Sequence, residues 1–160
     1  AAQGFQESQL DQSRRSPRGA VGIMQLLPST AASKPIEITD IDKSAEINIK
    51  AGARYMRHLR ENYVNDPAVN DKNQMLMALA AYNAGPGNLK SFRAITKEMG
   101  LNPNIWFKNV ERGAAKKVGL ETVQYVSNIY KYYLAYRSLL EREAAQSEAK
   151  ETIRRSILDR

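Results

Sequence analysis

The chain has 160 residues, a length that suits a single domain with a hydrophobic core. Its 24 Lys and Arg residues outnumber its 17 Asp and Glu residues, and the net charge of +7 favours an acidic partner such as an anionic polymer. The absence of cysteine excludes disulfides, thiol catalysis and cysteine metal sites, and no motif typical of nucleic-acid binding accompanies the charge.

The first forty residues predict short helices joined by turns. Residues 1–10 have the pattern of the end of a helix, so we expect the chain to be a domain taken from a longer precursor. Residues 11–22 are rich in Asp, Ser, Pro and Gly and predict an ordered loop. Pro28 suits the first turn of a short helix, and a short hairpin is considered near residues 36–43.

Three helices are predicted in the middle of the chain. Apolar residues recur every four positions between Ile47 and Leu59, which predicts one face of a long amphipathic helix over residues 44–63. A very apolar helix follows over residues 74–83 and stops at a Gly-Pro-Gly sequence. Another helix is predicted over residues 88–98.

The last third of the chain ends in a long helix. Residues 100–119 are mixed, with Gly113 among the predicted breaks. Residues 122–140 predict a tyrosine-rich helix, and residues 141–160 alternate their charges at helical spacing. The whole pattern is that of an all-α protein, with one domain over residues 1–140 and a solvated helical or partly disordered tail after it.

Glu7 is the candidate acid of a catalytic site. It lies near the predicted end of the first helix, beside Ser8, and a glycine-containing loop follows it. Partial burial against apolar walls raises the pKa of a carboxyl group, which can then protonate the departing oxygen of a glycosidic bond. An isolated helix glutamate is ordinarily a surface residue. The loop after Glu7 is what favours the catalytic interpretation.

The loop offers polar groups that suit a sugar. Ser16 is either a cap within the loop or a polar group near Glu7. The amide of Gln25 can both donate to and accept from hydroxyl and acetamido groups. Met24 beside it fits a core position better than a ligand contact.

Two later helices carry further candidates. Tyr82 and Asn83 end the apolar helix, and they either cap it or present a ring, a hydroxyl and an amide to a sugar. Tyr125 lies four residues after Glu121 on the last long helix. A tyrosine there is either a core residue or, if its hydroxyl reaches Glu7, the group that orients the acid.

The sequences QES, SPRGAVGIMQ, NIKAGARYM, ALAAYNAGPG and ETVQYV follow one another along the chain. Their order and spacing resemble the soluble-lytic-transglycosylase (SLT) catalytic domain, glycoside hydrolase family 23, over about residues 5–136. The resemblance implies a lysozyme-like helical fold with a substrate cleft. The segment ETVQYVSNIYKYYLAY is also similar to the membrane-bound F-type members of this family, in which a periplasmic, solute-binding-like regulatory domain is joined to the catalytic one.

The resemblance implies a role for each matching position. Glu7 matches the catalytic acid, and Tyr125, Ser16 and Ser8 match residues that orient or assist it. The positions that match substrate-binding residues are Gln25, Met24, Tyr82, Asn83 and Glu121.

The implied activity is non-hydrolytic cleavage of the bond between N-acetylmuramic acid (MurNAc) and N-acetylglucosamine (GlcNAc) in peptidoglycan, with no metal or cofactor. Glu7 acts first as acid and then as base, and the C6 hydroxyl of MurNAc closes a 1,6-anhydro ring. Asp11 is interpreted as a loop or cap residue rather than a second catalytic carboxylate. The expected partner is the glycan strand, in the periplasm and, for the full-length protein, at the outer membrane.

Two other functions are considered. A lysozyme-like hydrolase would share the fold and admit water, and a non-catalytic wall-binding module would share the surface without turnover. A nucleic-acid binder is the more distant third. The sequence leaves open the oligomeric state and whether cleavage is internal or from chain ends.

Overall fold

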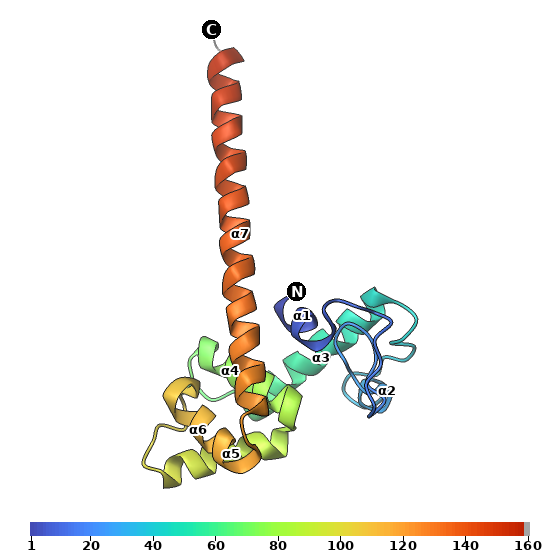
Figure 1. Ribbon diagram of the computed structural model, residues 1–160, viewed down its shortest axis with the longest axis vertical. Coiled ribbons are helices and arrows are strands. Elements are labelled where there is room, and N and C mark those ends of the chain that lie inside the picture. The colour runs from blue at the N-terminus through green and yellow to red at the C-terminus, as the bar shows by residue number, and fades with distance from the viewer. Residues whose placement is uncertain (159–160) are drawn as a thin grey trace.

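The computed structural model describes the backbone of residues 1–158 and the side chains of residues 1–151, and it is helical (Figure 1). In chain order the elements are α1 (Ala2–Ser8), α2 (Pro28–Ala32), α3 (Ala45–Tyr63), α4 (Asp71–Ala84), α5 (Pro86–Glu98), η1 (Trp106–Val110), α6 (Glu111–Val118) and α7 (Glu121–Leu158). The turn η1 is irregular, since Phe107 and Lys108 have non-helical backbone angles.

Two hydrophobic clusters form the core. The large cluster lies where α3, α4, α5, α6 and α7 meet, and its fully buried members include Leu59, Met77, Phe92, Trp106 and Val126. The small cluster joins α2 and the loops on either side of it to α3, through Val21, Leu26, Ala31, Ile36, Ile41 and Ala51. The rings of Tyr55 and Tyr82 pack against both clusters and therefore mark the junction between the two halves of the molecule.

The helix starts follow from local sequence. The side chain of Ser44 accepts a hydrogen bond from the Ile47 amide and caps α3, and Asn70 caps α4 through the Asn73 amide. The Asn70 cap explains why α4 begins before the predicted residue 74. Gly85 has a φ of 90° and is followed by Pro86 in the first position of α5, so that helix begins before the predicted residue 88.

Two predictions about local structure are wrong. No strand occurs within residues 1–158, and the hairpin considered near residues 36–43 is a series of turns that buries Ile36 and Ile41 in the small cluster. Gly113 does not break a helix but lies buried inside α6. A Cβ atom at that position would lie 2.3 Å from the Phe92 carbonyl oxygen, so the glycine is what allows α6 to approach α5 so closely.

We expect Gly113→Ala to destabilise the fold by about 3 kcal/mol, because the added methyl group meets backbone that cannot move aside without repacking α5 against α6. Urea unfolding followed by circular dichroism measures this change. Gly87→Ala on α5 is the matched control, since nothing lies within 4 Å of its Cβ position. We expect that variant to be unchanged or more stable by up to about 1 kcal/mol. Equal effects of the two substitutions would contradict the packing argument.

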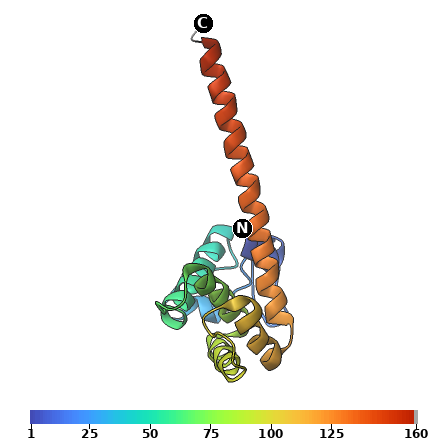
Figure 2. The ribbon, with the colours of Figure 1, turned by 90° about the vertical axis from the view of Figure 1, so that its left-hand side faces the viewer.

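Helix α7 extends well beyond the rest of the molecule, as Figures 1 and 2 both show. Residues 141–158, expected as a separate tail, continue this helix without a break, and residues 141–151 are exposed. Residues 159 and 160 of that expected tail lie outside the described residues. Among the helices of the described residues, none is both long and apolar enough to cross a membrane.

Candidate active site

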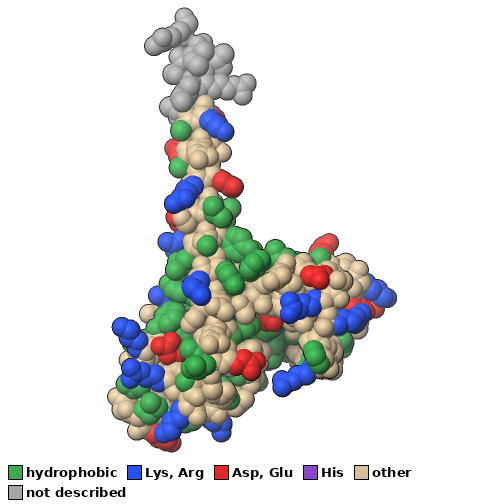
Figure 3. Space-filling model, viewed as in Figure 1, with side chains coloured by type: hydrophobic (Ala, Val, Ile, Leu, Met, Phe, Trp, Pro, Cys, Tyr) green, Lys and Arg blue, Asp and Glu red, His purple; other side chains and the backbone are tan. Residues whose placement is uncertain are grey.

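Glu7 lies in the last turn of α1, where that helix contacts α7. The helix ends because the next two residues, Gln9 and Leu10, adopt left-handed backbone angles with φ of 59° and 67°. The chain therefore turns away directly after Ser8. The partly buried Glu7 side chain lies at the end of the helix rather than in its middle. Figure 3 shows the surface hollowed between the two halves of the molecule.

The carboxyl group of Glu7 is held by Tyr125 of α7. The tyrosine hydroxyl donates a hydrogen bond of 2.5 Å to Oε1 of Glu7, across 118 residues of sequence, and the Tyr125 side chain is buried. Burial raises the pKa of Glu7 from its usual 4.5 to about 7, while the Tyr125 hydrogen bond and the Arg14 guanidinium oppose this rise. Near neutral pH the carboxyl group can therefore both give and take a proton.

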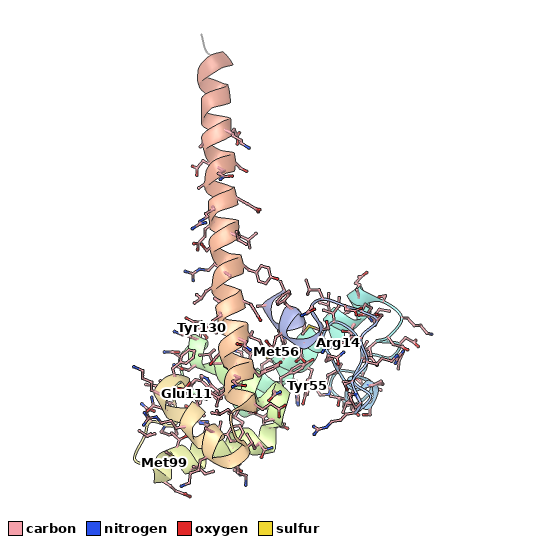
Figure 4. All side chains as sticks on the ribbon, viewed as in Figure 1. Arg14, Tyr55, Met56, Met99, Glu111 and Tyr130 are labelled. Carbon is pink, nitrogen blue, oxygen red and sulfur yellow. The ribbon has the colours of Figure 1, made fainter. Side chains whose placement is uncertain are left out.

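Tyr82 of α4 lies near enough to Glu7 for the two groups to interact electrostatically. Its hydroxyl donates a hydrogen bond of 2.8 Å to the Met24 carbonyl oxygen, and its ring centroid lies 5.1 Å from that of Tyr55 on α3. Burial, followed by the negative charge of Glu7, raises the pKa of Tyr82 well above its usual value. Tyr82 is thus a neutral phenol close to the acid, and it joins α4 to the loop around Met24. Figure 4 shows Arg14 and Tyr55 in this part of the molecule.

Asn48 of α3 fixes the loop that faces Glu7. It is fully buried, its Oδ1 accepts a hydrogen bond of 2.7 Å from the Met24 amide, and its Nδ2 donates to the carbonyl oxygens of Val21 and Ile41 at 2.9 and 3.0 Å. A Cβ atom at Gly22 would lie 2.4 Å from that Nδ2, so only glycine leaves room for the contact. One side chain thereby joins α3 to two separate loops.

Ser8 and Ser16 serve the framework around Glu7. The Ser8 hydroxyl is buried and lies 3.0 Å from the Ile23 carbonyl oxygen, which ties the end of α1 to the facing loop. The Ser16 hydroxyl accepts a hydrogen bond of 3.0 Å from the Ala20 amide and closes a tight turn. Of the two interpretations considered for Ser16, the loop cap is the one that matches its hydrogen bonding.

Gln25 and Met24 lie side by side in the loop but face different surroundings. Met24 is buried, as expected of a core residue. Gln25 is partly buried with a φ of 44°, and its amide nitrogen donates hydrogen bonds to the carbonyl oxygens of Arg14 and Gly22 at 3.1 and 2.9 Å. The amide hydrogens of Gln25 therefore hold the loop, and its Oε1 is the atom left to accept a hydrogen bond.

Asn83 and Glu121 lie where α4 ends and α7 begins. Asn83 is exposed, and its Oδ1 accepts a hydrogen bond of 2.7 Å from the buried Thr122 hydroxyl, which links the two helices. Glu121 is the exposed first residue of α7, one helical turn before Tyr125. Both side chains are thus placed by the same helix junction that positions Tyr125.

Asp11 belongs to the turn after α1. Its Oδ1 accepts hydrogen bonds from the amide and hydroxyl of Ser13 at 2.8 and 2.6 Å, and these bonds lower its pKa. This exposed, turn-forming carboxylate matches the expected loop residue. Among the described side chains, no group of three or more His, Asp or Glu residues could hold a metal ion.

Three residues of the site had no assigned role in the sequence-based interpretation: Gln3, Arg14 and Asn48. Asn48 was the easiest of them to identify from the sequence, because its amide interrupts the apolar face of α3. Gln3 lies one helical turn before Glu7, and its amide donates to the Tyr125 hydroxyl at 3.3 Å. Local sequence carries no signal for that contact, since Tyr125 is 122 residues away.

Residues 4–105 match the family model described as the transglycosylase SLT domain, and the chain belongs to this family. The predicted all-α, lysozyme-like fold is thereby confirmed, as is the resemblance that the motifs indicated. Similar proteins include three called membrane-bound lytic murein transglycosylase F. That of Shewanella woodyi is 37% identical over 148 residues, covering 83% of this chain and 29% of the relative.

The other two relatives give the same picture. That of Actinobacillus pleuropneumoniae is 36% identical over 146 residues, covering 83% of this chain and 29% of the relative. That of Aeromonas salmonicida is 34% identical over 164 residues, covering 93% of this chain and 31% of the relative. The chain thus spans about three-tenths of the length of these curated relatives.

We expect Tyr125→Phe to lower kcat about 10- to 100-fold with little change in KM, because the ring still fills the core while the hydrogen bond to Glu7 is lost. Losing that bond also raises the pKa of Glu7 further. Initial rates across a pH series measure both effects. Tyr132→Phe is the matched control, since Tyr132 lies on the same helix and contacts Phe5 of α1 through its ring. A similar loss in both variants would contradict a specific role of the Tyr125 hydroxyl.

Proposed function

We propose that this chain is the catalytic domain of a peptidoglycan lytic transglycosylase, which cleaves the β-1,4 bond between MurNAc and GlcNAc without water. The observation that carries the proposal is the partly buried Glu7, held by Tyr125 and with a pKa of about 7. Membership of the SLT family and the names of the relatives support the same activity.

Glu7 performs both proton transfers in the proposed reaction. Because Oε1 accepts the Tyr125 hydrogen, the acidic proton of Glu7 belongs on Oε2. That proton passes to the glycosidic oxygen as the bond to the MurNAc anomeric carbon breaks, and the substrate's own N-acetyl group stabilises the positive charge. The ionised Glu7 then takes the proton of the MurNAc C6 hydroxyl, whose oxygen bonds to the anomeric carbon and forms the 1,6-anhydro ring. Glu7 ends protonated, as it began.

The proposed substrate contacts use the atoms that the fold leaves available. The Oε1 of Gln25 can accept from a sugar hydroxyl or acetamido group, since its amide hydrogens are held in the loop. The amide nitrogen of Asn83 can donate, since only its oxygen is bonded to Thr122. Tyr82 offers its ring and the acceptor side of its hydroxyl, and Met24 supports that hydroxyl through its backbone. Glu121 lies at the same helix junction.

The full-length protein is proposed to act in the periplasm and at the outer membrane. The relatives named as membrane-bound support a location in the cell envelope, and their greater length leaves room for the solute-binding-like regulatory domain expected from the F-type resemblance. The proposed partner of this domain is the glycan strand rather than nucleic acid. The positive charge of the chain suits the carboxylates of the peptidoglycan peptides.

The products released from purified peptidoglycan sacculi test the function. We expect muropeptides that end in 1,6-anhydro-MurNAc, and no incorporation of ¹⁸O from labelled water at the anomeric carbon. Reducing ends that carry ¹⁸O would instead identify a lysozyme-like hydrolase. Binding to sacculi without any release would identify a non-catalytic wall-binding module.

A further inference from the structure

The Tyr125 hydroxyl is contacted by two side chains of α1, not one. It donates its hydrogen to Oε1 of Glu7 at 2.5 Å. From the neighbouring turn of the same helix, Nε2 of Gln3 donates to the Tyr125 oxygen at 3.3 Å. Gln3 and Glu7 are four residues apart and therefore share one face of α1. The three side chains form a chain of hydrogen bonds that runs from amide to phenol to carboxyl.

The direction of this chain follows from the groups themselves. An amide nitrogen donates and does not accept, so the Tyr125 oxygen is the acceptor for Gln3 and its only hydrogen is left for Glu7. The Tyr125 side chain is buried, with 6% of its surface exposed, so water has little access to its hydroxyl. A donor to the phenol oxygen also strengthens the bond that the phenol makes, because successive hydrogen bonds polarise one another.

We propose that Gln3 is a positioning residue, which acts through Tyr125 to keep the phenol hydrogen on Glu7 during the acid and base steps. This inference rests on the proposed function and adds a residue to the same site. Within the described residues, Gln3 makes no hydrogen bond to the carboxyl group of Glu7. Its influence on that group therefore passes through Tyr125.

Other charged and titratable groups face Glu7 from the neighbouring elements. Arg14 acts from the loop after α1, and Tyr125 contacts the carboxyl group from α7. Tyr82 acts from α4, and its ring packs on Tyr55 of α3. Arg14, Tyr82 and Tyr55 make no hydrogen bond to the Tyr125 hydroxyl within the described side chains. A substitution at Gln3 therefore changes that hydroxyl selectively.

Opposite charges at position 3 provide the test. In Gln3→Glu, a carboxylate accepts the Tyr125 hydrogen and repels the charge of Glu7, so we expect the pKa of Glu7 to rise by about one unit. We also expect kcat at pH 7 to fall about tenfold with KM nearly unchanged. In Gln3→Lys, an ammonium group still donates, so we expect the pKa of Glu7 to fall by about one unit and the pH optimum of kcat to fall with it.

The controls are Gln6→Glu and Gln6→Lys, which place the same charges on α1 next to Glu7 at a partly buried residue without a hydrogen bond to Tyr125. The pKa of Glu7 is followed by ¹³C NMR of its carboxyl carbon, assigned with Glu7→Gln. We expect the Gln6 variants to shift the pKa less than half as much. Gln3→Met, which keeps the length but not the donor, is measured as well, and each fold is checked by circular dichroism.

Two outcomes would overturn the inference. Equal pKa shifts in the Gln3 and Gln6 variants would show that a charge at position 3 acts on Glu7 like any other nearby charge and not through Tyr125. A Gln3→Met variant with a wild-type pKa of Glu7 and a wild-type pH profile would show that the donated bond is not used. The NMR titration decides this even if the wild-type protein releases nothing from sacculi, and that separate result would count against the proposed function instead.

Discussion

Replacing Glu7 with glutamine should abolish the release of anhydro-muropeptides and at the same time stabilise the folded protein at alkaline pH. Activity is lost because the amide can neither give nor take the proton. Stability is gained because the folded protein raises the pKa of Glu7 from 4.5 to about 7. Above pH 7 the wild-type protein holds an unfavourable buried charge, worth about 3 kcal/mol at most, that the variant lacks.

The sign of this pH dependence is fixed by proton binding. Between pH 4.5 and about 7 the folded protein binds more protons at Glu7 than the unfolded chain, so wild-type stability falls as pH rises through this window. Below the window both states are protonated, and Glu7→Gln should differ little from wild type. Urea unfolding at pH 4, 6 and 8.5 measures the difference.

The exposed Glu98 at the end of α5 provides the control, since Glu98→Gln should leave both activity and the pH dependence of unfolding unchanged. A stability difference between Glu7→Gln and wild type that stays constant over the whole pH range would contradict the raised pKa. Near-normal muropeptide release by Glu7→Gln would contradict its role as acid.

Replacing Asn48 with alanine should both unfold the protein more easily and reduce its activity. The substitution leaves the buried Met24 amide without its partner. The carbonyl oxygens of Val21 and Ile41 each lose one of two donors and keep the Leu26 amide and the Gln12 side chain, respectively. We expect a loss of about 3 kcal/mol in the free energy of unfolding. The loop opposite Glu7 also loses its tie to α3, so we expect kcat/KM on sacculi to fall about tenfold or more.

Asn62 lies on the same helix and gives the matched comparison. Its side chain is exposed and is hydrogen bonded to His58 one turn earlier. We expect Asn62→Ala to change stability by less than about 0.5 kcal/mol and to leave turnover unaltered. Thermal unfolding and initial rates of both variants, compared at one pH, measure the difference. A similar loss in the two variants would show that Asn48 has no special role.

The local parts of the fold were predictable because their causes are local. Pro28 marks the start of α2 and Ser44 the cap of α3, and both follow from backbone chemistry within one helical turn. Gly113 was misjudged because a glycine that breaks a helix and one that lets two helices touch have the same sequence signature. Only the position of α5 distinguishes them.

The site was predictable in part. Family motifs identify Glu7 and Tyr125, and the structure brings these two side chains together as that resemblance implied. Residue type alone does not reveal which neighbours hold them, because the contacts of Gln3 and Asn48 join distant segments. The catalytic role of Glu7 remains a prediction, as do the substrate-binding roles of Gln25, Met24, Tyr82, Asn83 and Glu121.

The hydrogen bond between Glu7 and Tyr125 spans 118 residues, so the acid is complete only when the beginning of the domain meets its last helix. Such a contact closes a long loop and is among those that form late when a chain folds. A nascent chain that has not yet produced α7 has Glu7 without the tyrosine that orients it. The assembly of the Glu7–Tyr125 pair therefore has to wait for the synthesis and folding of α7.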